Sequence, residues 1–427
     1  MTAATGLTRS ILIVGDGVVG LAAAIALHCA LPGAAIRLVQ LPGDGSSWLN
    51  RLGAASPTIH RFHRQVGLDP QLFARRTNAE PVDLRLYIRD GQPPVREAST
   101  ATIPFVEGVP LHHIWLRHRL ESGENAPDFA AMLLALREAR SDEGGFGARF
   151  DMAAYQSLLC EMAAALDIDV TSATEVVVAA ENGAIRGIAS DGGDVMTADL
   201  YIDAAGPRSR LLAPLGVGWT SWSGWLPRLS LSVSPDGGGT AGQERLTYAD
   251  SGIAWQTRHW RAVLAPDAAA PGPGCLSRYW LGNVAAIGEA AARAPAADGI
   301  GLGIALEDIL RLIALLPRPD GDGHEQREYD RRTAIAYRTL ANWSSLTLAP
   351  DAAGPPGLAE TGAAFAARGR IAIDELSPIQ PGEWLARLMT LYPTPRRVDP
   401  TALALPEAVI RSTIARAGPA LPLKVPT

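Results

Sequence analysis

The strongest constraint on the fold is a glycine pattern near the N-terminus, Gly15-Asp-Gly17-Val-Val-Gly20. It follows a short apolar run, Ile11 to Val14, that predicts a strand, and it opens an Ala- and Leu-rich stretch, Val18 to Leu31, with helical periodicity. Pro32-Gly33 is expected to end that helix, and the apolar run from Ala35 to Leu41 predicts a second strand. We therefore predict a βαβ unit at the start of a Rossmann-type α/β domain.

The glycine spacing gives each glycine a physical role in binding a dinucleotide. The first permits a tight turn, the second lets a pyrophosphate approach the backbone, and the third allows the helix to pack closely on the strand. The helix N-terminus at Val18 and Val19 would then face the phosphates. In this pattern an acidic residue usually follows about 20 residues further on and accepts hydrogen bonds from the ribose hydroxyls. Gln40 stands there, with Asp44 as the alternative, so this position does not choose between cofactors.

Composition and charge narrow the class of protein. The chain has 427 residues, enough for two or three domains, and 47% hydrophobic with 19% charged residues is typical of a globular protein. A formal charge of −6 argues against nucleic acid as a partner. Asp16 and the glycines exclude Ile11 to Leu31 as a membrane span or signal peptide, which predicts a cytoplasmic protein without membrane association. Cys29, Cys160 and Cys275 fit no metal or disulfide spacing, so buried thiols are expected.

Further secondary structure follows from the same patterns. Helices are predicted from Ala126 to Arg140, from Phe150 to Leu166 and from about Gly301 to Leu316. Hairpin turns are predicted at Glu181-Asn-Gly183 and at Asp191-Gly-Gly193. His112-His113 is expected to be a pair within a strand, because no third ligand at a suitable spacing indicates a metal site.

Two later segments carry carboxylates or glycines where an expected strand ends. The first is Tyr201-Ile-Asp203-Ala-Ala-Gly206-Pro-Arg208-Ser209. The second is Ala286-Ile-Gly288-Glu289, followed by Gly299-Ile300-Gly301 at the start of a helix. A carboxylate just past a strand can bind ribityl hydroxyls, and a helix start can face the pyrimidine edge of a flavin, where the reduced ring carries negative charge.

In this order, the three motifs resemble those of the glutathione-reductase-type flavoproteins of the aromatic hydroxylase and tryptophan halogenase superfamily, up to about residue 320. The resemblance implies an α/β fold with FAD as cofactor. It implies an FAD-binding Rossmann domain from residues 1–80, 150–216 and 275–318, a β-rich substrate domain from 81–149 and 217–274, and a C-terminal helical segment, 319–427. The residues expected at FAD are Gly15, Gly17, Val18, Val19, Gly20, Gln40, Arg51, Asp203, Gly206, Gly288, Glu289, Gly299, Ile300 and Gly301.

Two stretches resemble the flavin-dependent tryptophan halogenases in particular. Gly53-Ala-Ala-Ser-Pro57-Thr-Ile-His60-Arg61 is similar to the halogenase segment that leads to the catalytic lysine, and Phe150-Asp151 is similar to their His-Phe-Asp helix start. Arg61 takes the place of the lysine, and a guanidinium does not readily form a haloamine. Only Trp255 remains of the tryptophan-x-tryptophan-x-isoleucine-proline signature. Pro295 to Gly299 is one residue shorter than the family's Pro-Leu-Glu-Ser-Thr-Gly.

These departures favour an FAD-dependent monooxygenase that hydroxylates an electron-rich ring, such as a tryptophan or indole side chain, through a flavin C4a-hydroperoxide. His60, Arg61 and Asp298 are the candidate acid–base residues. The alternatives are a tryptophan-type halogenase with an altered pocket and a non-catalytic FAD-binding protein.

The length and the departures are also similar to the flavoprotein monooxygenases of quinohemoprotein amine dehydrogenase biogenesis, where tryptophylquinone forms. That resemblance implies a tryptophan-bearing polypeptide substrate, with the segment from about Arg318 onward as part of its docking surface. No second dinucleotide fingerprint is visible, so a separate flavin reductase is expected.

Overall fold

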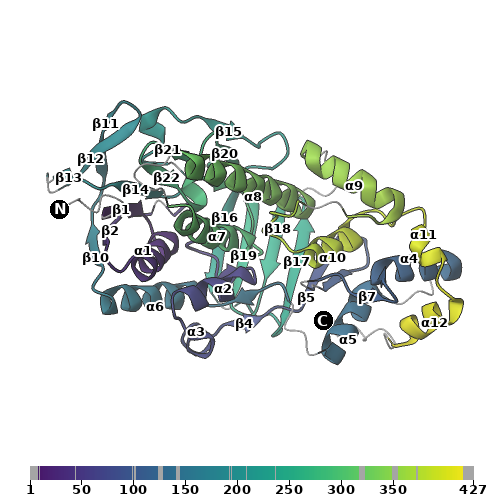
Figure 1. Ribbon diagram of the computed structural model, residues 1–427. Helices are drawn as coiled ribbons and strands as arrows, with labels where there is room; N and C mark the ends of the chain where they lie inside the picture. Colours follow the sequence, from purple (N-terminus) through teal and green to yellow (C-terminus); the bar gives the residue numbers. More distant parts are fainter. Residues whose placement is uncertain are drawn as a thin grey trace.

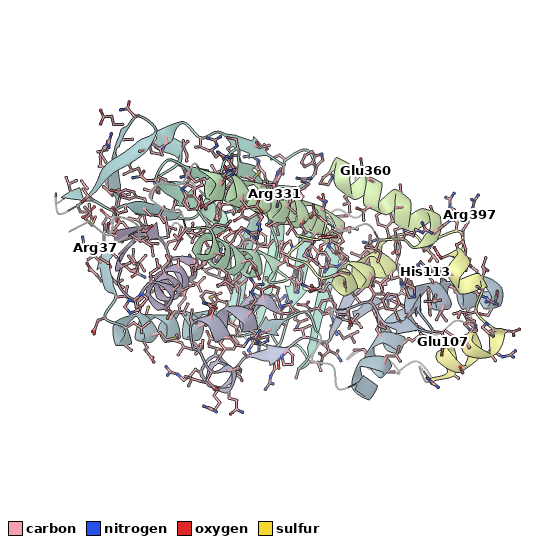
Figure 2. All side chains as sticks on the ribbon, in the orientation of Figure 1. Arg37, Glu107, His113, Arg331, Glu360 and Arg397 are labelled. Atoms are coloured by element: carbon pink, nitrogen blue, oxygen red, sulfur yellow. The ribbon has the colours of Figure 1, made fainter. Side chains whose placement is uncertain are left out.

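The computed structural model describes residues 8, 10–43, 45–98, 100, 102–123, 128–140, 145–191, 193, 195–207, 209–235, 237–316, 323–348, 354–371 and 374–416. In this part of the chain, two six-stranded sheets lie side by side, and helices cover them (Figure 1). Within the same residues, no helix combines the length and the apolar character that a membrane span requires. Charged side chains such as Arg37, Glu360 and Arg397 lie exposed at the outside of the molecule (Figure 2).

The first sheet is the predicted Rossmann sheet. Its central strand β1 (Ser10–Gly15) pairs in parallel with β2 (Ala35–Gln40) on one side and with β14 (Leu200–Ala204) on the other. Strand order therefore reverses at β1, and the carboxyl ends of these strands border the crevice where such sheets bind nucleotides. The full order is β10-β2-β1-β14-β22-β21, with β10 (Asp169–Ser172), β22 (Val284–Ala286) and the antiparallel edge β21 (Trp280–Leu281).

Three helices pack together beside the Rossmann sheet. Helix α1 (Val18–Ala30) contacts both α6 (Met152–Ala165) and α7 (Ile300–Ala314), and the buried side chains of all three join one large core. Val18 to Leu27 are all buried, as expected for a helix between a parallel sheet and its neighbours. The predicted α/β Rossmann architecture is confirmed.

The second sheet is antiparallel apart from one parallel pair, β17 with β5. Along β19 buried and exposed residues alternate, with Trp260, Ala262 and Leu264 buried, so one face of the sheet packs on a core. That core contains Trp48 and Leu52 from the loop after β2. The strand order is β16-β19-β18-β17-β5-β6, with β5 (Leu84–Arg89), β6 (Val95–Ala98), β16 (Leu229–Pro235), β17 (Gln243–Ala249), β18 (Gly252–Gln256) and β19 (Trp260–Pro266).

The C-terminal segment is helical, as predicted. Helix α8 runs along α7, and α10 packs on β6 of the second sheet. Helices α11 and α12 contact α4 at the end of the molecule away from the Rossmann sheet (Figure 1). These helices are α4 (Leu111–Ser122), α5 (Phe129–Arg140), α8 (His324–Leu348), α9 (Pro356–Arg368), α10 (Pro381–Leu391), α11 (Pro400–Leu403) and α12 (Glu407–Arg416).

Shorter elements connect these layers. The predicted turn at Asn182-Gly183 joins β11 to β12, and both residues have positive φ angles of 52° and 76°. The remaining elements are β3 (Ala54–Ala55), α2 (Thr58–Gln65), α3 (Pro70–Thr77), β4 (Glu80–Pro81), β7 (Phe105–Val106), β8 (Val109–Pro110), β9 (Ala148–Arg149), β11 (Val176–Glu181), β12 (Ala184–Ser190), β13 (Val195–Met196), η2 (Ala213–Leu215), β15 (Trp219–Ser221), β20 (Gly274–Leu276), η3 (Gly288–Ala290) and β23 (Ala292–Arg293).

Two local expectations are wrong. His112 and His113 lie in the first turn of helix α4 and not in a strand. Leu111, Ile114 and Trp115 repeat at helical spacing and are all buried, and this apolar stripe decides the conformation. The cysteines are not buried thiols: Cys29 and Cys160 are exposed, and Cys275 is half-buried.

Candidate active site

The glycine-rich turn lies at the carboxyl end of β1. Gly17 has a φ of 69°, and a Cβ atom there would overlap the side-chain amide of Asn50. A Cβ on Gly20 would lie 3.2 Å from Leu38 Cδ1 of β2, so the third glycine sets how closely α1 approaches the sheet. A Cβ atom on Gly15 would lie 2.9 Å from the Cβ atom of Ala204 in β14. These glycines shape the crevice through the absence of side chains.

The loop of residues 45–52, here called the Asn50 loop, closes the N-terminus of α1. Asn50 Oδ1 accepts a hydrogen bond from the Val18 N–H at 3.0 Å, and its Nδ2 donates to the Asp16 carbonyl at 3.2 Å. The Val18 amide is one of the free donors that a helix start offers to a phosphate. Gln40 is half-buried at the end of β2. Asp44 lies outside the described residues.

The Asp203 carboxylate stabilises the turn that follows β14. The side chain is fully buried and accepts hydrogen bonds from the Ala205 N–H at 3.2 Å, Ser209 Oγ at 2.6 Å and the Leu211 N–H at 2.7 Å. Burial raises the pKa of Asp203, although these hydrogen bonds oppose the shift. Asp203 therefore stabilises the turn around Gly206 and does not present a free oxygen for the ribityl contact expected from the sequence. Arg208 lies outside the described residues.

Glu289 holds the Asn50 loop from the opposite side. Its carboxylate accepts hydrogen bonds from Ser47 Oγ at 2.5 Å and from the Trp48 N–H at 3.1 Å, and it pairs with Arg293 Nη1 at 3.6 Å. Arg51 of the same loop contacts the second sheet, because its Nη1 donates a hydrogen bond to the Leu231 carbonyl of β16 at 2.6 Å. The loop thus links the Rossmann sheet to the second sheet.

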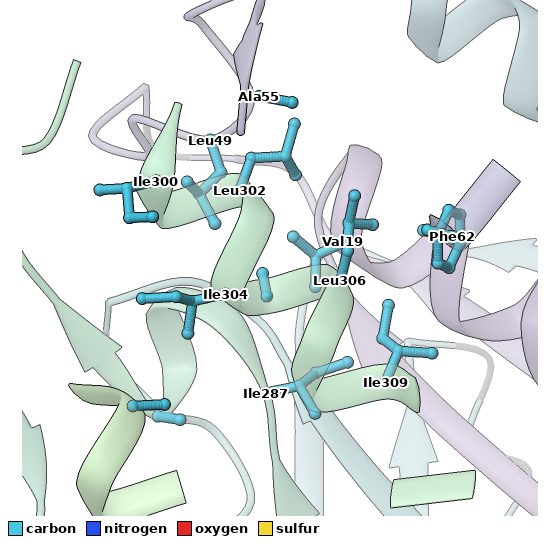
Figure 3. Close-up of a cluster of buried hydrophobic side chains, with 14 of the residues drawn as sticks. Val19, Leu49, Ala55, Phe62, Ile287, Ile300, Leu302, Ile304, Leu306 and Ile309 are labelled. Atoms are coloured by element: carbon cyan, nitrogen blue, oxygen red, sulfur yellow. The ribbon is translucent and has the colours of Figure 1, made fainter. Parts of the chain in front are cut away.

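The start of α7 completes this region. Gly299 has a φ of 85°, and a Cβ there would lie 2.5 Å from the Ala55 nitrogen. Gly301 allows Leu49 of the Asn50 loop to pack against the helix, where its Cδ2 would be 3.2 Å from an added Cβ. Figure 3 shows Leu49 beside Ile300 and Leu302, at the start of α7. Three motifs that are far apart in the sequence therefore meet around the Asn50 loop, at the carboxyl ends of the Rossmann strands, where such sheets bind nucleotides in a crevice.

The residues at this crevice fit FAD. Two helix N-termini supply backbone N–H groups for anionic groups, and Gly17 lets a diphosphate approach the backbone. Glu289 would accept ribityl hydroxyls only after its hydrogen bonds from Ser47 and the Trp48 N–H are released, and the glycine-rich start of α7 would face the pyrimidine edge of a flavin. The Val18 amide and the Glu289 carboxylate are both engaged by the Asn50 loop in this structure.

A network of buried charges lies between the second sheet and the C-terminal helices. Arg85 donates to Glu244 Oε1 at 2.6 Å and to Glu97 Oε2 at 3.1 Å, and Arg387 of α10 donates to Glu97 Oε1 at 2.8 Å. Arg149 pairs with Glu244 at 3.0 Å. All five side chains are at most 1% exposed. Such a network persists only if its charges are paired and hydrogen-bonded.

Indole and phenol groups take part in the same network. Trp255 Nε1 donates to Glu244 Oε2 at 2.9 Å, and the Tyr87 hydroxyl donates to Glu97. Burial alone would raise the pKa of Glu244, but the guanidinium groups of Arg149 and Arg85 lower it overall. Trp255, predicted as the remaining signature tryptophan, is therefore a partner of a buried carboxylate.

Asp298 joins this network to the start of α7. Its Oδ2 accepts the Trp343 indole N–H at 2.5 Å and lies 3.6 Å from Arg387 Nη2. Its Oδ1 accepts the Ile300 N–H at 3.3 Å, and its backbone carbonyl accepts from Arg149 at 3.1 Å. The side chain is buried, so Asp298 is a fixed part of the wall between the crevice and the C-terminal helices.

The three candidate acid–base residues do not form one site. His60 and Arg61 are exposed on α2, because Ile59, Phe62 and His63 turn the opposite face of that helix into the core. Arg61 pairs with Glu307 of α7 at 2.6 Å and is 59% exposed. Asp298 lies in the buried network and the other two lie on the surface, and the choice among the three as the acid–base residue stays a prediction.

Arg61 borders a cavity of about 550 Å³ between α2, α7, α8 and the segment before α10. Ser56 forms one end of it, beside the start of α7: its N–H donates to the Gly299 carbonyl at 3.1 Å. Glu383, a buried carboxyl at the start of α10, also lines the cavity. The charged residues of the lining are Arg61, Glu307, Arg311, Arg332, Glu375 and Glu383.

Comparison with known proteins assigns this arrangement to a family. A family model described as tryptophan halogenase matches residues 10–258, which is more than half of the chain. The chain belongs to the tryptophan halogenase family. It is accordingly a flavin-dependent enzyme whose cofactor is FAD, and the predicted resemblance is confirmed at this level.

Solved structures share the fold over nearly the whole chain. A flavin-dependent halogenase from Xanthomonas campestris is 20% identical with a TM-score of 0.84, covering 96% of this chain and 94% of its own. One from Brevundimonas sp. BAL3 is 21% identical with a TM-score of 0.82, covering 96% and 95%. A tryptophan 6-halogenase from Streptomyces toxytricini is 17% identical with a TM-score of 0.77, covering 96% of both. A search of curated protein sequences gave no match.

Several residues of this site were not predicted from the sequence. Glu383 and Arg387 lie in α10, in a segment for which only helical content was expected. The sequence does carry one usable signal, because Gln380-Pro-Gly-Glu383 has the spacing of a capping box and so marks a helix start. Nothing in the local pattern shows that this helix start lines a cavity.

Proposed function

We propose that this chain is an FAD-dependent monooxygenase that hydroxylates an electron-rich aromatic ring, with tryptophan or another indole as the favoured substrate. One observation carries the proposal: the sequence contains a single lysine, Lys424, which lies outside the described residues. The cationic side chains that line the cavity are Arg61, Arg311 and Arg332. A guanidinium does not readily take up and transfer a halogen as an amine does.

The cavity is the proposed place of the substrate ring. Its end at Ser56 adjoins the start of α7, where the flavin edge is expected. When bound and reduced, FAD supplies the two electrons with which one atom of O₂ becomes water while the other enters the ring. The chain's own residues close one side of this region to water, because the buried network around Arg85, Glu97 and Arg387 fills the space behind Asp298.

The site's carboxylates already bind indole N–H groups. Asp298 accepts the Trp343 N–H, and Glu244 accepts the Trp255 N–H. Both carboxylates are occupied by these contacts and lie outside the cavity lining, so the choice of an indole as substrate rests on the match to the tryptophan halogenase family. A tryptophan within a polypeptide is the narrower form of the proposal, with the helices after residue 318 as the docking surface. A separate flavin reductase and the predicted division into domains are parts of the same proposal.

The test uses the purified full chain with FAD, NADH and a separate flavin reductase under ¹⁸O₂. Tryptophan, indole and a tryptophan-containing peptide serve as probes, each with and without bromide, and products are identified by mass. We expect one atom of ¹⁸O in the product, with bromide making no difference. Lys424→Arg should give the same products at the same rate. Incorporation of bromine without oxygen would contradict the proposal.

Halogenation is the second candidate, and the family match favours it. In that case the halogen would need a carrier other than a lysine of the described cavity. Bromination that is lost in Lys424→Arg would assign the carrier to the C-terminal lysine. Bromination that survives in that variant would show that the chain halogenates without any lysine.

A further inference from the structure

Glu383 is a buried carboxyl at the edge of the cavity. It lies in the first turn of α10 and is only 7% exposed, yet it lines the cavity together with Ser56 and Gln380. Its Oε2 accepts the Gln380 N–H at 2.9 Å, which caps the helix. Within the described part of the chain, Oε1 has no hydrogen-bond partner. One oxygen therefore fixes the side chain and the other remains for a ligand.

The charges around Glu383 come from α2, α7, α8, α10, β5 and the segment before α10. Burial raises the pKa of Glu383 to about 7, the negative charge of Asp298 at the start of α7 adds to the shift, and Arg387 on the same helix and Arg85 of β5 oppose it. The carboxyl therefore changes protonation near neutral pH, where a general acid or base is most effective. The other charged groups that line the cavity are Arg61 of α2, Glu307 and Arg311 of α7, Arg332 of α8, and Glu375.

We propose that Glu383 is a catalytic residue that exchanges a proton with the aromatic substrate in this cavity. The inference rests on the proposed function and deepens it. The Glu383 carboxylate accepts the proton of an indole N–H or phenol O–H as the ring carbon forms its bond to oxygen. Glu383 returns this proton to the nitrogen or oxygen when the hydrogen of the ring carbon is lost as a proton and aromaticity returns, so one substrate proton is released for each oxygen atom inserted.

The other carboxylates near the cavity are less suited to this role. Both oxygens of Asp298 accept hydrogen bonds, from Trp343 and Ile300, and Asp298 is not part of the cavity lining. Glu307 is engaged by Arg61 at 2.6 Å. Asp298 is accordingly a positioning residue, which fixes the start of α7 and raises the proton affinity of Glu383.

The first measurement detects the titration without any activity. Glu383→Gln keeps the cap, because an amide oxygen can accept the Gln380 N–H, but it cannot ionise. A carboxyl whose pKa rises on folding destabilises the ionised protein, and this cost grows between the ordinary glutamate pKa of 4.5 and about 7. The melting temperature of Glu383→Gln minus that of the wild type should therefore increase from about pH 5 to about pH 8. Glu360→Gln, at an exposed position outside the cavity lining, should give a flat difference.

The second measurement is product yield per reduced FAD as a function of pH. Glu383→Gln should lower the rate by about 100-fold and remove the rate change near pH 7, while Glu383→Asp recovers part of it. Glu360→Gln, on α9 and outside the cavity lining, should keep the wild-type profile. If the wild type forms oxygenated product and Glu383→Gln keeps the wild-type pH profile, the inference about Glu383 is wrong and the proposed function stands. The same holds if the difference in melting temperature does not change with pH. A wild type that forms no oxygenated product defeats the proposed function, and the inference with it.

Discussion

The indole N–H of Trp343 donates to Asp298 Oδ2 at 2.5 Å and thereby joins α8 to the start of α7. The guanidinium carbon of Arg387 lies 3.9 Å from the centroid of the same indole ring, and its Nη2 lies 3.6 Å from Asp298. Asp298 also accepts the Ile300 N–H of α7. The helix start at which the flavin edge is expected is therefore positioned by residues of the C-terminal helices.

Replacing Trp343 with Phe tests whether its hydrogen bond to Asp298 contributes more than the packing of the ring. Trp343→Phe leaves a buried carboxylate without one donor, which we expect to cost about 1–3 kcal/mol in free energy of unfolding, measured in urea. It should also lower product formation more than FAD binding. Trp384→Phe is the matched control, because Trp384 packs edge-on against Trp343 and its buried Nε1 has no hydrogen-bond partner among the described residues. Equal losses in the two variants would argue against a specific role for the Asp298 contact.

Asn50 should compete with FAD for the start of α1. Asn50→Ala removes the group that caps the Val18 amide, so the FAD-free protein should lose about 1 kcal/mol of stability. Since that N–H no longer has to be released, FAD should bind up to about five-fold more tightly. Asn50→Asp should instead bind FAD more weakly, because its carboxylate repels the diphosphate. Fluorescence titration of FAD measures both, and weaker binding in Asn50→Ala would show that Asn50 contacts the cofactor.

Gly299 should tolerate no side chain. Its φ of 85° costs an L-residue about 1–2 kcal/mol, and a Cβ would lie 2.5 Å from the Ala55 backbone nitrogen. Gly299→Ala is therefore expected to lower the free energy of unfolding by more than the backbone cost alone and to reduce FAD occupancy after purification. Gly33→Ala is the control, because no atom lies within 4 Å of a Cβ there and the change should stay within about 0.5 kcal/mol. A fully loaded, stable Gly299→Ala would contradict the close approach described here.

The buried pair of Arg387 and Glu97 should show strong coupling. Removing one partner, as in Arg387→Met or Glu97→Gln, leaves a buried charge and should cost about 3–5 kcal/mol. In a double-mutant cycle measured by denaturation, the double variant should lose less free energy of unfolding than the two single variants lose in sum. The exposed pair of Arg411 and Glu407, both more than 60% exposed, should couple by less than about 1 kcal/mol. Additive losses at Arg387 and Glu97 would mean that each acts through other partners of the network.

Local sequence pattern was sufficient for much of the fold. The apolar run before Gly15 and the periodicity from Val18 predict β1 and α1 nearly to the residue, because strands and helices need different spacings of buried side chains. The three motifs predict the crevice, since a glycine or carboxylate at a strand end has a restricted set of uses. The family and the cofactor follow from the same short segments.

Only the tertiary structure decided which charged groups meet. Glu97 and Arg387 are far apart in the sequence, and each is an ordinary surface residue type until packing buries both together. Arg61 matches a motif position, but the buried face of α2 turns it to the surface, while Asp298 lies in the buried network. Glu383 carries only a helix-capping signal in the sequence, and the cavity beside it is formed by four separate segments. A local pattern fixes the direction of a helix or strand, but the partners and the protonation of a side chain depend on what the rest of the chain places against it.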